Sequence, residues 1–161
     1  MRRITEQGLD FIKGFEKFEA SPYICPAGKL TIGFGRLVKN TADFPRPITI
    51  EEGLQLLAQD VAWAERAVLN HIRIPLMDFQ FDALVSFAFN CGGPALQRST
   101  ARRRINRWDL VRGADALRMW CKGGRPLRFF QGLFNRRDCE REMFLFGWDA
   151  ANDLRAAQMA R

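Results

Sequence analysis

The chain has 161 residues, of which 47% are hydrophobic, and a formal net charge of +7. This length and composition are typical of one globular domain with a sizeable core. No apolar run is long enough to cross a membrane, and the charged start Met1–Glu6 lacks the apolar core of a signal peptide. We therefore expect a protein that is made in the cytoplasm without an export signal.

A carboxylate stands at the end of the first predicted helix. Thr5 can cap this helix, and Leu9, Ile12 and Glu16 share one of its faces at helical spacing. Burial and the negative end of the helix dipole both favour a protonated carboxyl group, which is the form that a general acid needs. A surface glutamate beside neighbouring lysines is the alternative, so the spacing alone leaves the role of Glu16 open.

A small hairpin is predicted after this helix. Residues 23–25 and 30–34 have the pattern of two short strands, and Pro26-Ala27-Gly28-Lys29 has the pattern of the turn between them. Cys25 ends the first strand, and Thr31 points away from the apolar face of the second strand, so these two side chains can share one space. A small buried hydrophobe at Cys25 and an ordinary strand threonine at Thr31 are the alternatives.

A long helix is predicted after a polar loop. Thr49 and Glu52 form a capping-box pattern at its start. Apolar residues then recur on one face from Leu54 to Ile72, and Pro75 ends the pattern. Such a helix is long enough to connect a hairpin lobe with a helical lobe.

The next helix is predicted to be central and buried. Asp78 can cap it, and residues 79–89 are apolar on nearly every side. The sequence Cys91-Gly92-Gly93-Pro94 ends it. Asn90 lies at that end, where it can bind a sugar amide or take a capping or turn role; the sequence does not decide between them.

The segment from residue 98 to residue 137 is strongly basic. Its Lys and Arg residues are Arg98, Arg102, Arg103, Arg104, Arg107, Arg112, Arg118, Lys122, Arg125, Arg128, Arg136 and Arg137. The acids in the same span are Asp109 and Asp115. Attraction to an anionic polymer or surface is one interpretation, and a solvated basic face is the other. Ser99 and Asp109 are predicted helix caps, and Gly123-Gly124 a break.

Metal and cofactor chemistry is not predicted. The four cysteines, at positions 25, 91, 121 and 139, lack the spacing of metal ligands, and His71 is the one histidine. We therefore predict no metal site and no cofactor, and we expect reduced thiols at synthesis. A Cys25–His71 hydrolase dyad is disfavoured, because His71 lies near a helix end where a structural role is more common.

Three motifs follow one another over roughly residues 5 to 147. They are Glu16, Cys25 and Thr31 with intervals of eight and five residues and a following Gly33-Phe34-Gly35; the helix 80–90; and Asn135-Arg136-Arg137 at the start of the last long helix. Together they resemble the phage lysozymes of glycoside hydrolase family 24, of the lambdoid and T-even types. The family pattern has Glu, then Asp or Cys, then Thr, so Cys25 takes the place that is Asp in many members.

The resemblance implies a muramidase that hydrolyses the β-1,4 bond between N-acetylmuramic acid and N-acetylglucosamine in peptidoglycan. Glu16 matches the general acid, Cys25 the second catalytic position and Thr31 a residue that helps to place the attacking water. Arg136 matches an arginine that faces the catalytic glutamate across the sugar cleft. Such chemistry needs one group to protonate the leaving oxygen and a second to stabilise positive charge or guide water.

Two positions depart from the common family pattern. A thiol has an ordinary pKa of about 8.5 and is a weaker base than a carboxylate at neutral pH. Whether Cys25 acts as a base, a hydrogen-bonding orienter or a transient nucleophile therefore stays open. Arg36 stands where many relatives have histidine, which puts a supporting salt bridge of the family in question.

We therefore predict an α+β, mostly helical, lysozyme-like fold with two lobes in a single catalytic domain over residues 1–161. The small hairpin lobe is expected at about 15–58, and the helical lobe at about 1–14 and 59–161. The expected partner is peptidoglycan, and the basic C-terminal lobe also suits an anionic outer-membrane or lipid surface. We expect a monomer and no specific nucleic-acid partner.

The implied role is lysis of the host cell. The enzyme would act on the cell wall in the periplasm after a holin has permeabilised the membrane. Three alternatives stay open: a catalytically silent domain that binds peptidoglycan or a partner, a basic nucleic-acid-binding module, and a muramidase whose basic lobe also disrupts membranes.

Overall fold

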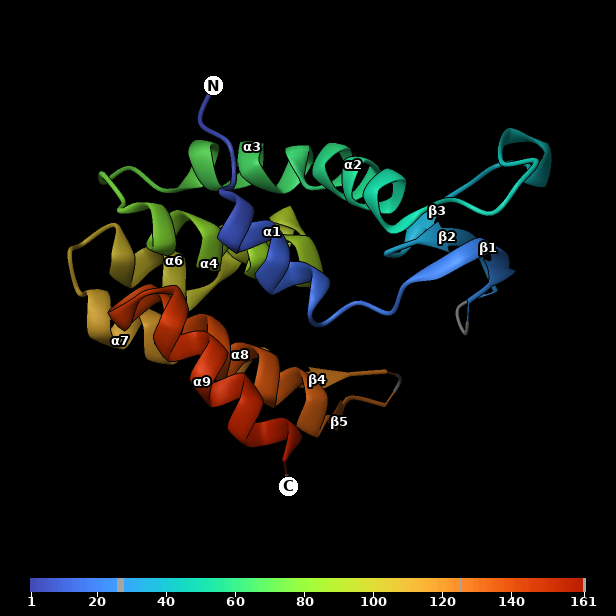
Figure 1. Cartoon of the computed structure of the whole chain (residues 1–161). Coiled ribbons are helices and arrows are strands. Elements are labelled where there is room, and N and C mark those ends of the chain that lie inside the picture. Colours follow the sequence, from blue (N-terminus) through green and yellow to red (C-terminus); the bar gives the residue numbers. More distant parts are fainter. Residues whose placement is uncertain (26–27, 125, 161) are drawn as a thin grey trace. The chain divides into compact units, whose positions relative to one another are not determined.

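The chain forms two units, and each has its own buried residues. Figure 1 shows the helices and strands of the chain. The computed structural model describes residues 1–25, 28–124 and 126–160. The sheet unit consists of Ile12–Ala62, and the helical unit consists of Met1–Phe11 and Trp63–Arg161. Helices predominate over strands in the described residues, and none of these helices is long and apolar enough to cross a membrane.

The sheet unit is built on three antiparallel strands in the order β1-β2-β3. Its elements are β1 (Glu19–Ile24), β2 (Leu30–Gly33), β3 (Arg36–Leu37), the 3-10 turn η1 (Thr41–Asp43) and α2 (Ile50–Asp60). In the register, Tyr23 lies opposite Thr31, and Thr31 lies opposite Leu37 on the other side of β2. The predicted hairpin strands are therefore present, but residues 26 and 27 of the predicted turn lie outside the described residues.

Helix α2 packs closely on the apolar face of this sheet. Ile32 and Leu57 are buried, and the rings of Phe18 and Phe34 lie 5.1 Å apart. A Cβ atom on Gly53 would lie 2.7 Å from the ring of Phe18, so the absence of a side chain at this position allows the close approach. Burial of these apolar side chains is the main source of stability of the unit.

The helical unit contains most of the remaining elements. They are α1 (Glu6–Lys13), α3 (Ala62–His71), α4 (Asp78–Cys91), α5 (Gly93–Arg98), α6 (Thr100–Ile105), α7 (Leu110–Asp115), η2 (Ala116–Met119), β4 (Lys122–Gly123), β5 (Arg128–Phe129), α8 (Gln131–Phe146) and α9 (Trp148–Met159). Helix α1 begins in this unit and ends in the sheet unit. Helix α4 is its centre, because every residue from 81 to 88 is buried.

Helices α8 and α9 pack together, and α8 also packs against α4 (Figure 1). The carboxylate of Asp82 on α4 accepts hydrogen bonds from the backbone and hydroxyl of Thr5 and from the indole of Trp148. Burial raises the pKa of Asp82, while these hydrogen bonds oppose the shift. Arg155 on α9 donates to the backbone carbonyl of Phe11 at 3.4 Å, which attaches the last helix to the first.

Three of the predicted helix starts are confirmed. The hydroxyl of Thr5 accepts a hydrogen bond from the N–H of Gly8 at 3.0 Å. Thr49 and Glu52 form the full capping box, with the N–H of Glu52 bonded to the Thr49 hydroxyl and the N–H of Thr49 bonded to the Glu52 carboxylate. Ser99 also caps its helix with its side chain.

Other predicted boundaries are wrong. The single long helix is divided at Val61, whose N–H is shared between the carbonyls of Leu57 and Gln59, and no proline or glycine marks this break. Asp78 is the first residue of α4 and not its cap, because the capping position belongs to Met77. Gly124 does not merely interrupt a helix: it takes a positive φ of 76° between β4 and β5, a second hairpin that the pattern did not predict.

Candidate active site

Glu16 lies in a turn after α1 and not within the helix. The helix ends at Lys13, the residue before Gly14, and glycine is a poor helix former. The N–H of Glu16 then donates to the carbonyl of Lys13 at 3.1 Å, and the N–H of Phe15 donates to that of Ile12 at 2.9 Å. The side chain of Glu16 is half-buried. The helical position predicted for Glu16 is therefore wrong, although the backbone is held by hydrogen bonds.

Cys25 and Thr31 are connected through one backbone carbonyl. Cys25 follows directly after β1, and Thr31 lies on β2. The carbonyl oxygen of Lys29 accepts the N–H of Cys25 at 2.9 Å and the hydroxyl of Thr31 at 3.0 Å. Thr31 is only 3% exposed, so its hydroxyl has a fixed direction, whereas Cys25 is half-buried. The structure thus brings these two predicted residues together at the turn end of the hairpin.

A bulge in β1 lies between Glu16 and Cys25. Between Glu19 and Tyr23, β1 has three residues where β2 has one. Pro22, which has no N–H to donate to a neighbouring strand, is one of the three. Such a bulge bends its strand and changes the direction of the chain. All three predicted catalytic residues belong to the sheet unit. Along the chain, Glu16 precedes the bent strand β1, and Cys25 and Thr31 follow it.

An ion pair connects the last strand of the sheet to the end of α2. The guanidinium of Arg36 lies 3.0 Å from the carboxylate of Asp60 and also donates to Gln59 at 3.2 Å. Burial raises the pKa of Asp60, and the positive charge of Arg36 opposes this shift. Arg36, at the position where the family resemblance put a salt bridge in question, thus makes an ion pair with Asp60.

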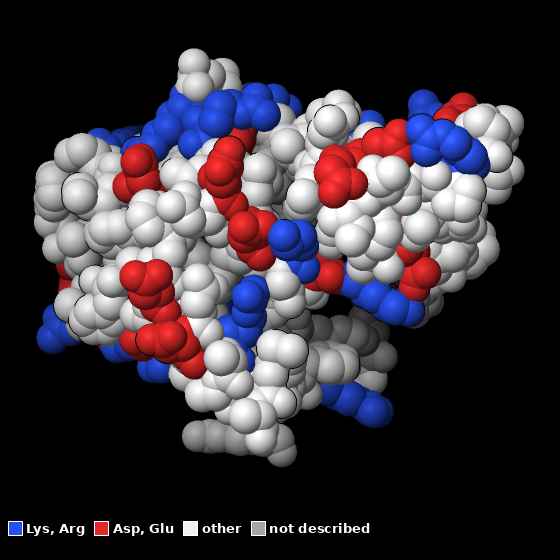
Figure 2. Space-filling model, viewed as in Figure 1, with Lys and Arg blue, Asp and Glu red and all other residues white. Residues whose placement is uncertain are grey.

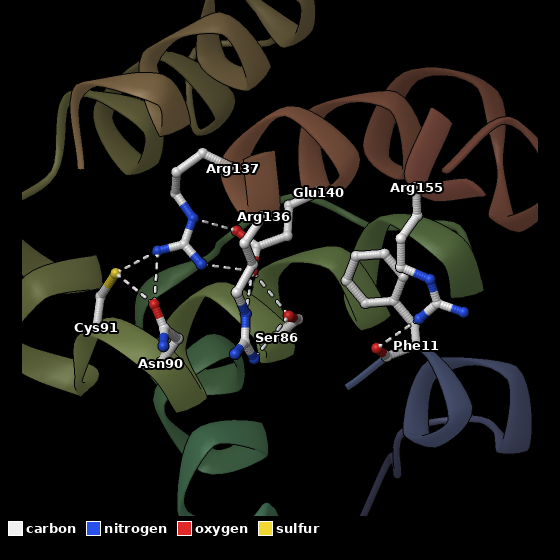
Figure 3. Close-up of polar contacts among 8 residues, drawn as sticks. All are labelled: Phe11, Ser86, Asn90, Cys91, Arg136, Arg137, Glu140 and Arg155. Atoms are coloured by element: carbon white, nitrogen blue, oxygen red, sulfur yellow. Dashed lines mark hydrogen bonds and ion pairs between the residues drawn. The ribbon is translucent and has the colours of Figure 1, made fainter. Parts of the chain in front are cut away.

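The helical unit contains a buried polar network (Figure 3). Glu140 on α8 is fully buried, and its Oε1 atom accepts three hydrogen bonds. The donors are the Ser86 hydroxyl at 2.7 Å, Arg137 Nη2 at 2.7 Å and Arg136 Nε at 3.3 Å. Arg136 is 4% exposed and Arg137 is fully buried, so two buried guanidinium groups share the single negative charge of Glu140.

Asn90 belongs to the same network. Nη1 of Arg137 donates to the Asn90 side-chain oxygen at 3.0 Å and to Sγ of Cys91 at 2.6 Å. Burial raises the pKa of the Cys91 thiol, and the charge of Arg137 opposes the shift. Asn90 and Arg136, which were predicted separately, are therefore connected through Arg137 and Glu140 (Figure 3).

The sequence prediction missed Glu140 and Ser86. The one available signal was the spacing of Glu140, three and four residues after two arginines on one helix, which is the spacing of helical ion pairs. Ser86 gave no signal, because a serine in an apolar helix does not reveal its partner.

Ion pairs neutralise part of the basic segment. Arg104 pairs with Asp109 at 2.7 Å, and Arg118 pairs with Asp138. Arg125 lies outside the described residues. On the face drawn in Figure 2, Lys and Arg side chains are interspersed with Asp and Glu side chains. The remaining basic surface is smaller than the count of arginines suggests.

Comparison with known proteins identifies the family. The family model described as phage lysozyme matches residues 13–140, and the chain belongs to this family. It is 34% identical to the endolysin of Salmonella phage P22 over 148 residues, which cover 90% of this chain and 99% of that protein.

Solved structures agree with this assignment. The endolysin from Escherichia coli O157:H7 phage FAHEc1 superposes with a TM-score of 0.82 and 35% identity, covering 90% of this chain and 94% of that one. The muramidase domain of SpmX from Asticaccaulis excentricus has a TM-score of 0.79 and 31% identity, covering 90% and 99%.

The predicted fold class and enzyme class are confirmed. The chain has the mostly helical α+β lysozyme-like fold with a small sheet, and it is a glycoside hydrolase of the phage lysozyme class. Endolysin muramidase activity, with peptidoglycan as substrate, follows from family membership. The roles of Glu16, Cys25, Thr31, Asn90 and Arg136 stay predictions.

We expect Glu140→Gln to lower the free energy of unfolding by about 3 kcal/mol or more, because the buried guanidinium groups of Arg136 and Arg137 lose the negative charge of this shared partner. Urea unfolding followed by circular dichroism measures this change. Glu51→Gln, at an exposed position of α2, is the matched control and should change stability by less than about 0.5 kcal/mol. Equal stabilities of the two variants would contradict the importance of the network.

We expect Arg36→Met to make stability depend more strongly on pH in the acidic range. The folded-state pKa of Asp60 is already above its unfolded value, and loss of the cation raises it further. The folded state then binds the proton more tightly than the unfolded state, so stability falls as pH rises through the window between the two pKa values and is constant above it. Urea midpoints across this window test the expectation. The double variant Arg36→Met/Asp60→Asn should lose the added slope, and an unchanged slope in the single variant would refute it.

Proposed function

We propose that the enzyme cleaves the β-1,4 bond between N-acetylmuramic acid and N-acetylglucosamine with Glu16 as the general acid. What supports this role is the motif spacing together with the placement of Glu16, a half-buried carboxyl group in a turn held by backbone hydrogen bonds. In this mechanism Glu16 gives its proton to the glycosidic oxygen as the bond breaks. A water molecule attacks the sugar carbon and releases one proton to solvent, from which Glu16 is protonated again.

In this proposal Thr31 and Cys25 orient or activate that water molecule. The Thr31 hydroxyl uses its hydrogen to bond the Lys29 carbonyl, so the lone pairs of its oxygen remain to accept a hydrogen bond from water. Cys25 is fixed to the same carbonyl through its backbone N–H. The shared Lys29 carbonyl is the observation that supports the assignment, because the backbone of Cys25 and the hydroxyl of Thr31 both bind it at one end of the hairpin.

Asn90 is proposed to contact the substrate from the helical unit, and Arg136 to support substrate binding through the buried network. Asn90 is exposed, and because Arg137 holds its side-chain oxygen, its amide nitrogen is directed to donate to a sugar acetamido group. Arg136 is nearly fully buried, and it contributes by holding the network that fixes Asn90. In this proposal the sheet unit and the helical unit form one catalytic domain.

The proposed biological role is lysis of a bacterial host from within. The similarity to proteins named endolysin, such as that of Salmonella phage P22, supports this role. The enzyme would act as a monomer on the cell wall in the periplasm after a holin has permeabilised the membrane.

We expect Glu16→Gln to reduce hydrolysis at least about 100-fold, because the amide cannot supply the proton. The assay is turbidity loss of Gram-negative sacculi stripped of outer membrane, under reducing conditions, with release of new reducing ends. Glu19→Gln is the matched control, since Glu19 lies in the same unit and pairs with Lys17. This variant should keep the activity of the unmodified enzyme. Clearing that persists in Glu16→Gln would mean that the acid is misassigned. No clearing by the unmodified enzyme would favour a silent peptidoglycan-binding domain.

Thr31→Val should lower kcat at least about tenfold with little change in KM, because it removes the acceptor for the attacking water and no substrate contact. Thr31→Ser keeps the hydroxyl and should retain most of the activity. Both variants are checked by urea unfolding, so that loss of activity is compared between folded proteins. If the valine variant is as active as the serine variant, the proposed role of Thr31 fails.

A further inference from the structure

The turn between α6 and α7 has an unusual backbone. Trp108 has a φ of 64°. In the part of the chain that the structure describes, no other residue except glycine has a positive φ. The turn is closed by hydrogen bonds from the N–H of Trp108 to the carbonyl of Ile105 at 2.9 Å and from the N–H of Asp109 to that of Arg104 at 3.1 Å. Bulky residues avoid this conformation, and glycine or asparagine usually occupies it after a helix.

Packing does not compensate for this strain. The Trp108 side chain is 63% exposed, and Val111, three residues later, is 58% exposed. A strained residue with few contacts of its own raises the question of a function outside the fold. These two exposed apolar side chains, three residues apart in the chain, make up a small apolar tip.

A hollow lined by arginines is formed by α6 and the same turn. Thr100, Arg103, Arg104, Arg107 and Asp109 line a hollow of about 360 Å³. The guanidinium of Arg103 is held by the carbonyl of Arg98 at 2.9 Å and by the hydroxyl of Thr100 at 2.7 Å. Asp109 is the one acid in the lining and pairs with Arg104, so the hollow keeps a net positive charge.

We propose that this turn is a docking surface for an anionic phospholipid membrane. The Trp108 surface consists of Arg103, Arg107, Trp108, Val111 and Arg112, of which Arg112 is 74% exposed on α7. Trp108 and Val111 enter the interfacial layer, where tryptophan is favoured, and the guanidinium groups bind lipid phosphates. This contact is separate from the proposed chemistry on Glu16 and would hold the enzyme at a membrane.

Chemistry favours lipid over other anionic partners. Nucleic acid would satisfy the arginines and stack on Trp108, but it offers nothing to Val111. Peptidoglycan offers carboxylates without an apolar layer. The apolar tip has only two side chains, so binding should be peripheral, reversible and sensitive to salt.

The test is sedimentation of the full chain with vesicles of phosphatidylcholine, with and without phosphatidylglycerol. The parent protein should bind only the anionic vesicles, and added salt should release it. Each arginine near such a surface contributes about fivefold in affinity, so Arg103→Ser/Arg107→Ser should bind about 25-fold more weakly. Arg66→Ser/Arg128→Ser removes the same charge from exposed positions on α3 and β5 and should bind like the parent.

Trp108→Asn separates docking from structure. Asparagine suits a positive φ, so this variant should be at least as stable as the parent while binding the vesicles several-fold more weakly. Its clearing of stripped sacculi should be unchanged, which distinguishes failure of this proposal from failure of the muramidase proposal. Equal loss in the two double-arginine variants, parent-like binding by Trp108→Asn, or a Trp108-dependent binding of DNA or sacculi in place of vesicles would overturn the proposal.

Discussion

The fully buried carboxylate of Glu140 constrains how α8 packs on α4. An uncompensated charge inside a protein costs several kcal/mol, so this carboxylate must keep its partners. Its partners come from two helices: Arg136 and Arg137 from α8 itself, and Ser86 from α4. Helix α8 therefore cannot rotate or slide along α4 without breaking the hydrogen bond between the Ser86 hydroxyl and this buried carboxylate. Arg137 extends this constraint to Asn90, so the exposed end of α4 is fixed by the same charge.

A second carboxylate gives α4 its other attachments. Asp82 lies one helical turn before Ser86 and binds Thr5 near the start of the chain and Trp148 at the start of α9. The central helix thus uses two buried polar positions to hold elements from both ends of the sequence. Apolar packing alone is less selective, because it depends on volume more than on direction.

Sequence patterns within one or two helical turns predicted caps and strands well. They could not predict which residues far apart in the sequence become partners in the fold. The capping box at Thr49 was predictable because both of its residues lie within one turn. The helical spacing of Glu16 was misleading, since spacing does not show where a helix ends. Counting charges over residues 98–137 overstated the basic surface, because Asp138 and Glu140, just beyond that span, supply neutralising partners. The order of the motifs indicated which residues belong to the candidate site. It did not show the hydrogen bonds that orient these residues, because those bonds depend on the fold.

The oxygen that joins Cys25 to Thr31 belongs to the main chain of Lys29. Every amino acid has the same backbone carbonyl. The side chain at position 29 can therefore change in evolution without loss of the two hydrogen bonds to Cys25 and Thr31. Insertions and deletions are different, because one residue more or less between Cys25 and Lys29 would move the carbonyl relative to both partners. Among descendants of this sequence, the length of that segment should therefore drift more slowly than its composition.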